Sequence, residues 1–280
     1  MAFPDFLIIG AMKCGTTTLA SQLGAQDGIF MSTPKEPNFF SDDDVYARGP
    51  GWYQSLFDPA PSGALLGEAS THYTKLPTYP HTLLRLSETL DAPRLIYLIR
   101  DPMARAVSHY MHEWTQGVIS SDLDTALTTH PEIVSYGCYA MQVQPWVDLY
   151  GQDRILVSSM EEMQRDPQGL LSRVGHFLGR EDLVWRDDLG RENVSSDRIR
   201  RLPMQRLIVD NALATWLRRT LVPQSLRDRI KQSRQMKTRP RLSPEAEARL
   251  ARIFAEDRDR LMALFPGQPD LELSYRALPA

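Results

Sequence analysis

A lysine and three hydroxyl side chains stand close together near the start of the chain, in a turn bounded by glycines. Lys13 lies between Gly10 and Gly15. The hydroxyl side chains follow at once and belong to Thr16, Thr17 and Thr18. The backbone N–H groups of such a turn, the start of a helix and the charge of a lysine all favour an anion. These residues are therefore predicted to bind a phosphate group.

The order of these residues differs from that of the Walker A loop. The Walker A pattern is G-x-x-x-x-G-K-[ST], in which lysine follows the second glycine. Here the glycine spacing is the same, but Thr16 takes the lysine position and Lys13 lies inside the loop. A tight strand-to-helix turn with an incidental lysine is the alternative interpretation.

An arginine further along the chain predicts a second anion site. Arg100 follows an apolar run and precedes Asp101 and Pro102, which suit the N-cap and the first turn of a helix. An arginine can bind a phosphate through two hydrogen bonds, and Ser108 on the same helix can add a hydroxyl. The two anion sites are expected to lie beside each other.

Acid–base chemistry is suggested by a charged pair in a loop bounded by prolines. Lys35 and Glu36 lie between Pro34 and Pro37, which makes a helix there unfavourable. Two aromatic residues follow, of which Phe39 is the first, and the segment is a candidate to face a substrate. A surface turn anchored by the aromatic residues is an equally good interpretation.

Two further groups of side chains are candidates to face the same site. The loop after the next apolar run carries Glu68, Ser70 and His72. The helix after Asp101 carries, off its apolar stripe, Arg105, Ser108, His109 and His112. A lone histidine is more often structural, which is the alternative for each of these.

Apolar runs that alternate with helical patterns would position these residues. Strands are expected at 6–9, 29–31, 65–71 with its exit loop, 94–99 and 154–158. Such alternation predicts an α/β fold with a P-loop-like, central parallel sheet covered by helices on both faces. Open α/β sheets bind ligands at the carboxyl ends of their strands, which is where the candidate residues would meet.

Composition limits the class of protein. The 280 residues are 42% hydrophobic and 24% charged with a net charge of −3, as in soluble globular domains, and no nucleic-acid partner is expected. The two cysteines form no disulfide framework, and no Cys/His spacing suits a metal. With neither a signal peptide nor a membrane span in the pattern, a cytoplasmic location is expected.

One domain is expected over 1–280, in three parts. These are an α/β nucleotide-binding core at 1–189, a basic, helical region at 190–241, and a C-terminal helix and tail at 242–280. Between Arg198 and Arg241, thirteen Lys or Arg and two Asp give a net charge of +11. This basic region suggests a lid, an acceptor-binding face or a peripheral membrane contact, and a packed sub-domain is the alternative. The sequence does not predict the oligomeric state.

Together these stretches resemble the sulfotransferases that use 3′-phosphoadenosine 5′-phosphosulfate (PAPS). The resemblance is strongest to the bacterial branch related to heparan sulfate sulfotransferase domains, and it spans most of the chain. Residues 10–19 resemble the 5′-phosphosulfate loop, 98–108 the 3′-phosphate motif, 35–40 the segment of the catalytic glutamate, and 239–244 the start of the last helix. The chain departs from this pattern at Ala69, where the relatives have a lysine, and in lacking their cysteine-bracketed loop.

The resemblance implies roles for the motif residues. Lys13 would contact the 5′-phosphosulfate and stabilise the leaving phosphate, and Glu36 would be the general base. Binding of PAPS would further involve Gly15, Thr16, Thr17, Thr18, Arg100, Ser108 and Lys237. Contacts to the sulfuryl acceptor are expected from Lys35, Phe39, Ser70, His72 and His112.

The implied reaction transfers the sulfuryl group of PAPS to a hydroxyl or amine and leaves 3′,5′-ADP. The acceptor would be a small molecule, a carbohydrate or a lipid. A P-loop small-molecule kinase or NTPase is one alternative, and it would need a lysine after the second glycine and an acid for Mg²⁺. A non-catalytic protein that binds an anionic surface through the basic region is another.

Overall fold

Five short apolar runs form a parallel sheet. The computed structural model describes residues 2–189, 236 and 238–278. The strands are β1 (Phe6–Gly10), β2 (Ile29–Met31), β3 (Leu65–Ala69), β4 (Arg94–Ile99) and β5 (Ile155–Ser159). They pair in parallel in the order β2-β3-β1-β4-β5, so β1 lies at the centre. Both faces of such a sheet are covered, which is why every residue of β1 is buried and apolar or glycine.

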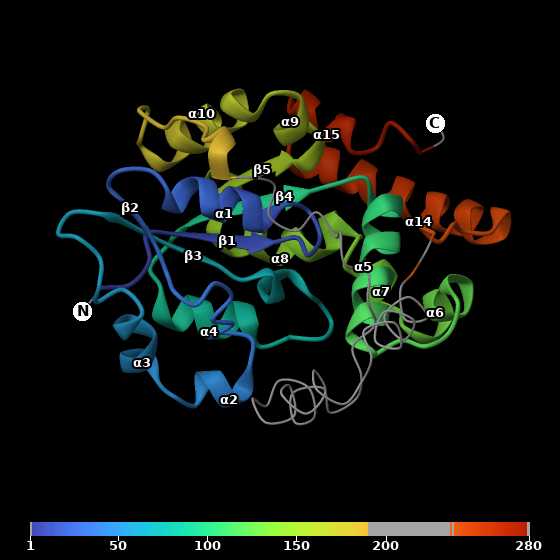
Figure 1. Ribbon diagram of the computed structural model, residues 1–280, viewed down its shortest axis with the longest axis horizontal. Coiled ribbons are helices and arrows are strands. Elements are labelled where there is room, and N and C mark those ends of the chain that lie inside the picture. The colour runs from blue at the N-terminus through green and yellow to red at the C-terminus, as the bar shows by residue number, and fades with distance from the viewer. Residues whose placement is uncertain (1, 190–235, 237, 279–280) are drawn as a thin grey trace, which may run out of the picture.

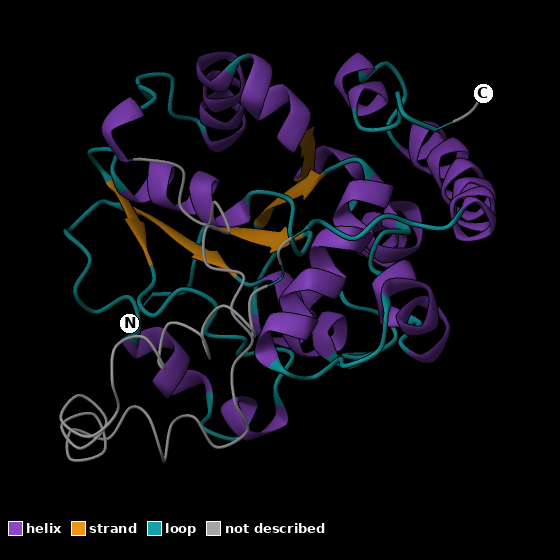
Figure 2. Cartoon of the chain, turned by 45° about the vertical axis from the view of Figure 1, so that its right-hand side comes forward, coloured by secondary structure: helices purple, strands orange, loops and turns teal. Residues whose placement is uncertain are grey.

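Helices cover the sheet on both faces, as the sequence predicts (Figures 1 and 2). The chain crosses from β1 toward β2 through α1 (Thr16–Gly24), and in the opposite direction from β3 to β4 through α4 (Thr82–Thr89). Right-handed crossovers in opposite directions place these two helices on opposite faces. In Figure 1 α1 and α4 lie on the two sides of the strands.

The remaining helices extend these two layers. Between β2 and β3 lie α2 (Asp43–Tyr46) and α3 (Pro50–Ser55), and the 3-10 helix Thr71–Thr74 follows β3. Between β4 and β5 lie α5 (Pro102–Gln116), α6 (Leu123–Thr129), α7 (Glu132–Ser135) and α8 (Tyr139–Tyr150). After β5 come α9 (Met160–Arg165), α10 (Pro167–Leu178), α14 (Pro244–Leu264) and α15 (Pro269–Leu273). Among the described residues no helix combines the length and the apolar character needed to cross a bilayer.

The long helix α14 begins where the sequence predicts it. The Ser243 hydroxyl accepts the N–H of Ala246, which caps the helix. The helix packs against α8 and α5. Its buried Asp257 accepts two N–H groups at the start of α8. Its apolar residue Ile253 is 36% exposed.

Three glutamine amides hold the extended segment 183–186 against α1 and α10. Gln22 both donates to the carbonyl of Arg186 and accepts its N–H, at 2.8 and 2.9 Å. Gln26 does the same for Val184, and Gln168 bonds the residues on either side of Val184. The three amide side chains thus make the hydrogen bonds that the backbone of a neighbouring strand would otherwise make to this segment. The basic region that follows, including the helices expected there, lies almost wholly outside the described residues.

Candidate functional site

The loops after β1 and β4 flank the switch point of the sheet. The chain leaves β1 toward β2 on one side, and leaves β4 toward β5 on the other. Ligands of open α/β sheets bind at such a point, outside the carboxyl ends of the strands. Both predicted anion-binding stretches therefore stand at one location. We call residues 10–18, together with Arg100 and Ser108, the nucleotide side of the site.

The backbone of the first loop is turned to present its N–H groups. Lys13 and Gly15 have left-handed φ values of 69° and 86°. Gly15 is the N-cap of α1, and no side chain caps the helix there. A Cβ at Gly15 would lie 2.4 Å from Cε of Met163, so both the conformation and the space require glycine. The uncapped N–H groups at the start of α1 are free to bind an anion.

Two cations meet across the switch point. Nη1 of Arg100 donates to the backbone carbonyl of Lys13 at 3.4 Å, which places the two loops in contact. Burial, and after it the charge of Arg100, lowers the pKa of Lys13. Among the described residues neither cation forms an ion pair within 4.0 Å. Two adjacent, unpaired cations favour a ligand with more than one negative charge.

Arg100 is held by its neighbours. The Asp101 side chain accepts the N–H of Ala104 at 2.6 Å and caps α5, with Pro102 at its first position, as predicted. The Tyr139 hydroxyl donates to the carbonyl of Arg100 at 2.8 Å. The predicted partner Ser108 is half-buried on α5. The backbone of Arg100 is therefore fixed at the sheet edge.

The loop that carries Glu36 is bound to the end of β3. The Glu36 N–H donates to the carbonyl of Ala69 at 3.0 Å, and Glu36 has a left-handed φ of 57°. The N–H of Asn38 donates to the hydroxyl of Ser70 at 3.1 Å. Ser70 is fully buried and positions this loop, and its contact with a sulfuryl acceptor stays a prediction.

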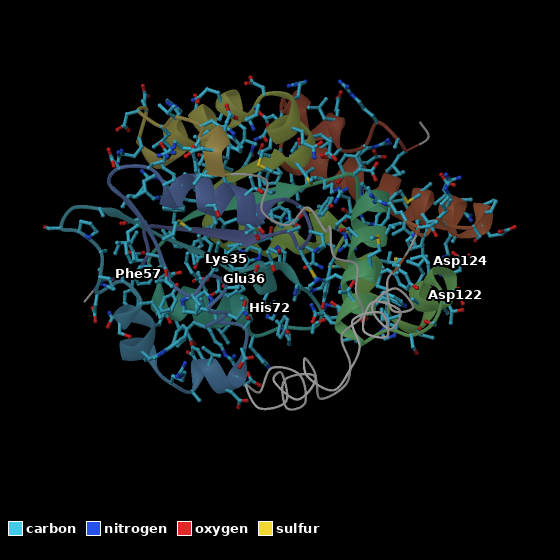
Figure 3. All side chains as sticks on the ribbon, in the orientation of Figure 1. Lys35, Glu36, Phe57, His72, Asp122 and Asp124 are labelled. Carbon is cyan, nitrogen blue, oxygen red and sulfur yellow. The ribbon has the colours of Figure 1, made fainter. Side chains whose placement is uncertain are left out.

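The Glu36 carboxylate has one occupied and one nearly free oxygen. Oε1 is 2.7 Å from Nζ of Lys35, and Oε2 receives only a 3.4 Å hydrogen bond from the hydroxyl of Thr71. Burial acts to raise the pKa of Glu36, but the charge and hydrogen bond of Lys35 and the charge of Lys75 outweigh it, so the pKa is lowered. The carboxylate is therefore ionised at neutral pH. Figure 3 shows Lys35, Glu36 and His72 close together.

The aromatic residue after this loop lies in the core. Phe39 is 1% exposed and stacks on Tyr53 with ring centres 4.6 Å apart. The ring thus helps to anchor the loop of Glu36, and the contact of Phe39 with a sulfuryl acceptor stays a prediction. Glu68, also expected to face the site, is fully buried and accepts the hydroxyls of Tyr53 and Tyr73. Burial raises its pKa to about 7.

The segment after β3 brings two more titratable groups toward Glu36. His72 stacks on Tyr79 with ring centres 4.5 Å apart, and burial, with the charge of Lys75, lowers its pKa to about 4. Burial likewise lowers the pKa of Lys75 to about 8, while the charges of Glu36 and Glu113 act to raise it. His72 is neutral at pH 7 and Lys75 remains mostly protonated.

The last turns of α5 face the same residues. Burial, and after it the charge of Lys13, lowers the pKa of His112, which also feels the charges of Glu113 and Glu36. His109 is buried, and its neighbour Glu113 has a pKa lowered chiefly by the bond from His109. We call Glu36, His72, Lys75, His112 and Glu113 the acceptor-side cluster.

A hydrogen bond joins the segment before Lys75 to the end of β1, next to the nucleotide side. The Thr74 hydroxyl, next to Lys75, donates to the carbonyl of Ile9 at 2.8 Å. A Cβ at Gly10 would lie 1.9 Å from that hydroxyl oxygen, so only glycine permits this approach. The end of β1 and the segment after β3 therefore move together.

Sequence reasoning missed Lys75 and Glu113. Both lie next to predicted segments, since Lys75 follows the loop of His72 and Glu113 adjoins His112. Only the fold brings them to Glu36. The predicted nucleotide contact Lys237 lies outside the described residues. Among the described residues no group of three His, Cys, Asp or Glu is placed to hold a metal ion.

Comparisons with known proteins agree with this geometry. A family model described as "Sulfotransferase domain" matches residues 3–258. Homo sapiens heparan sulfate glucosamine 3-O-sulfotransferase 6 is 30% identical over 194 residues, or 65% of this chain and 54% of that protein. Mus musculus heparan sulfate glucosamine 3-O-sulfotransferase 3B1 is 27% identical over 190 residues, or 65% of this chain and 47% of that protein. The chain thus spans about half the length of these curated relatives.

Two solved structures have the same fold over nearly the whole chain. A sulfotransferase from Alicyclobacillus acidocaldarius has a TM-score of 0.67 and 24% identity, covering 94% of this chain and 96% of that one. Mouse sulfotransferase SULT7A1, solved as a complex with PAP, has a TM-score of 0.56 and 17% identity, covering 98% of this chain and 89% of that one.

Proposed function

The chain belongs to the sulfotransferase family, and we propose that it transfers the sulfuryl group of PAPS to a hydroxyl or amine by in-line displacement. The observation that carries the proposal is the contact between Lys13 and Arg100 across the switch point. Two unpaired cations and an uncapped helix start suit a nucleotide with phosphates on both sides of its ribose. Glu36 lies near enough to Lys13 for its charge to offset part of the lowering of the Lys13 pKa.

The proposed roles follow from these positions. The loop N–H groups and the hydroxyls of Thr16, Thr17 and Thr18 bind the 5′-phosphosulfate. Arg100 and Ser108 bind the 3′-phosphate. Lys13 stabilises the negative charge that develops on the leaving 5′-phosphate.

Glu36 is the proposed general base. Its Oε1 is held by Lys35, whereas Oε2 has only the long bond from Thr71. Oε2 therefore takes the proton of the attacking hydroxyl or amine. The new bond forms between the attacking atom and sulfur, the bond from sulfur to the bridging phosphate oxygen breaks, and that electron pair leaves with 3′,5′-ADP.

The kinase alternative gains no support from these observations. Thr16 occupies the Walker A lysine position, and Asp101 already caps α5. The acceptor is proposed to be a carbohydrate or another hydroxylated small molecule, since the curated relatives named above are heparan sulfate sulfotransferases.

Calorimetric titration with 3′,5′-ADP tests the proposal, with ATP–Mg²⁺ and 5′-AMP as controls. We expect tight binding of 3′,5′-ADP alone and its loss in Arg100→Ala. The matched control is Arg154→Ala, since Arg154 is exposed and precedes β5 at the other edge of the sheet. Preference for ATP–Mg²⁺, or equal binding by Arg100→Ala, would overturn the proposal.

A further inference from the structure

Lys75 is a buried cation that forms no ion pair in the described part of the chain. Its side chain is 9% exposed, and its Nζ lies 5.8 Å from the centre of the Tyr136 ring. Among the described residues no carboxylate lies within 4.0 Å of it. Burying an ammonium group is costly unless another group compensates. A ligand is the group that would supply this compensation.

Two buried residues on the same helix, Arg105 and His109, lie in a row that ends at Glu113. Nη1 of Arg105 lies 3.5 Å from Nδ1 of His109, and Nε2 of His109 lies 3.6 Å from Oε1 of Glu113. Arginine can only donate, so Nδ1 accepts and the proton of the neutral ring lies on Nε2. Burial lowers the pKa of His109 to about 4, which keeps the ring neutral. The Nε2–H of His109 therefore faces Oε1 of Glu113 at 3.6 Å, and His109 lowers the pKa of this carboxyl, which stays ionised.

One aromatic ring supports both groups. Tyr136 stacks on His109 with ring centres 5.4 Å apart, and the same ring lies beside the amine of Lys75. The Tyr136 hydroxyl bonds the hydroxyl of Thr78, which fixes the ring. Lys75 and His109, the neighbour of Glu113, thus lie against the same ring, and among the described residues Lys75 and Glu113 form no ion pair within 4.0 Å.

The charges around this pair select among possible ligand groups. An anionic group would be attracted by Lys75 but would meet the carboxylates of Glu113 and Glu36. A cationic group would be attracted by the carboxylates but would meet Lys75. An uncharged hydroxyl accepts a hydrogen bond from an ammonium and donates one to a carboxylate, so it satisfies both.

We propose that Lys75 and Glu113 are specificity-determining residues that bind a second hydroxyl of an uncharged, polyhydroxylated acceptor. The first hydroxyl would be the one that Glu36 deprotonates. This inference rests on the proposed function and names its acceptor class. It predicts a neutral acceptor, although the curated relatives named above are heparan sulfate enzymes.

The test compares three matched probes that differ in one charge. They are the 4-nitrophenyl β-glycosides of glucose, glucuronic acid and glucosamine, assayed with ³⁵S-labelled PAPS. The proteins are the full chain, Lys75→Met, Glu113→Gln and the matched control Glu88→Gln, whose carboxylate is exposed on α4. Titration with 3′,5′-ADP accompanies every assay.

We expect the wild type to prefer the glucoside. Each site variant should raise KM for it by about tenfold or more, the loss of one hydrogen bond to a charged group. Lys75→Met should shift the preference toward the amino sugar, and Glu113→Gln toward the glucuronide. Affinity for 3′,5′-ADP should not change in any variant. If the two residues had only a structural role, their substitution would change the affinity for 3′,5′-ADP or raise the KM for all three glycosides equally.

Three results would overturn the inference and leave the proposed function standing. They are a wild-type preference for a charged glycoside, unchanged KM in both site variants, and no transfer to any glycoside although 3′,5′-ADP binds. Failure of the wild type to bind 3′,5′-ADP would instead overturn the proposed function, and this inference with it.

Discussion

The nucleotide side and the acceptor-side cluster are built by different means. Most donors of the nucleotide side are backbone N–H groups at the end of β1 and the start of α1, whose position is that of the sheet itself. The acceptor-side cluster consists of side chains from three separate segments: the loop of Glu36, the segment after β3 and the end of α5. A backbone N–H group is present whatever the side chain of its residue, whereas a substitution removes a side-chain contact. Nucleotide binding is thus a property of the fold, and the choice of acceptor is a property of a few side chains.

Glu36→Gln should impair catalysis at the acceptor side and leave nucleotide binding intact. Its effect on kcat should be the largest of the variants considered. The amide cannot take a proton, so kcat should fall by about 10²–10⁴-fold. Its shape keeps the loop in place, so 3′,5′-ADP should bind as before. Single-turnover transfer from ³⁵S-labelled PAPS measures the first effect and calorimetry the second.

Near-normal turnover in Glu36→Gln would place the base elsewhere. The control is Glu88→Gln, which makes the same chemical change on the exposed face of α4. If Glu36→Gln also lost 3′,5′-ADP binding, the separation between the two sides of the site would be refuted.

Lys13→Ala should break the nucleotide side and therefore impair two steps. Loss of an electrostatic donor at the leaving phosphate should reduce kcat by about 10²–10³-fold. Affinity for 3′,5′-ADP should fall as well, because Lys13 is proposed to contact the 5′-phosphate. Comparing kcat with the dissociation constant of 3′,5′-ADP checks both effects. A variant that loses turnover but binds 3′,5′-ADP normally would show that Lys13 acts only in the chemical step.

Glu68→Gln tests the buried carboxyl group at the end of β3, the strand that precedes His72 and Lys75 of the acceptor-side cluster. The pKa of the buried carboxyl is about 7, above its ordinary 4.5, so the folded protein holds this proton where the unfolded chain loses it. The contribution to stability is present below pH 4.5 and is lost as the pH rises toward 7, by about 3 kcal/mol. Urea unfolding at pH 5 and 7.5 should show this loss in the wild type and not in Glu68→Gln. Parallel pH profiles for the two proteins would contradict the assignment.

The family, the fold class and all five strands predicted from the sequence are confirmed. These predictions succeed because they rest on local signals: apolar runs for buried strands, Asp101 and Ser243 as caps, and glycine where φ is positive. The stripe predicted on α5 was incomplete. Arg105 and His109 are buried although they lie off it, because α7 packs against this helix.

The sequence indicates the position of a site residue best where its motif is contiguous, and less well where burial determines the environment of the side chain. The loops of Lys13 and Arg100 meet, as expected from their positions after neighbouring strands. Phe39 follows Glu36 closely in the sequence and Ser70 follows β3, yet the Phe39 ring packs in the core and the Ser70 hydroxyl accepts the N–H of Asn38. Lys75 and Glu113 could not be found because no spacing in the sequence connects them. The roles of individual residues remain predictions that the variants above would test.

The hydrogen bond from Thr74 to the carbonyl of Ile9 has a consequence for the kinetics. It fastens the end of β1, where the nucleotide loop begins, to the residue before Lys75. If binding of one substrate displaced the loop, this bond would pass the displacement to the binding site of the other, and the two affinities would be coupled. Thermodynamic reciprocity then requires that each substrate change the affinity of the other by the same factor. The order of substrate addition and the pattern of product inhibition by 3′,5′-ADP would both reflect this single bond.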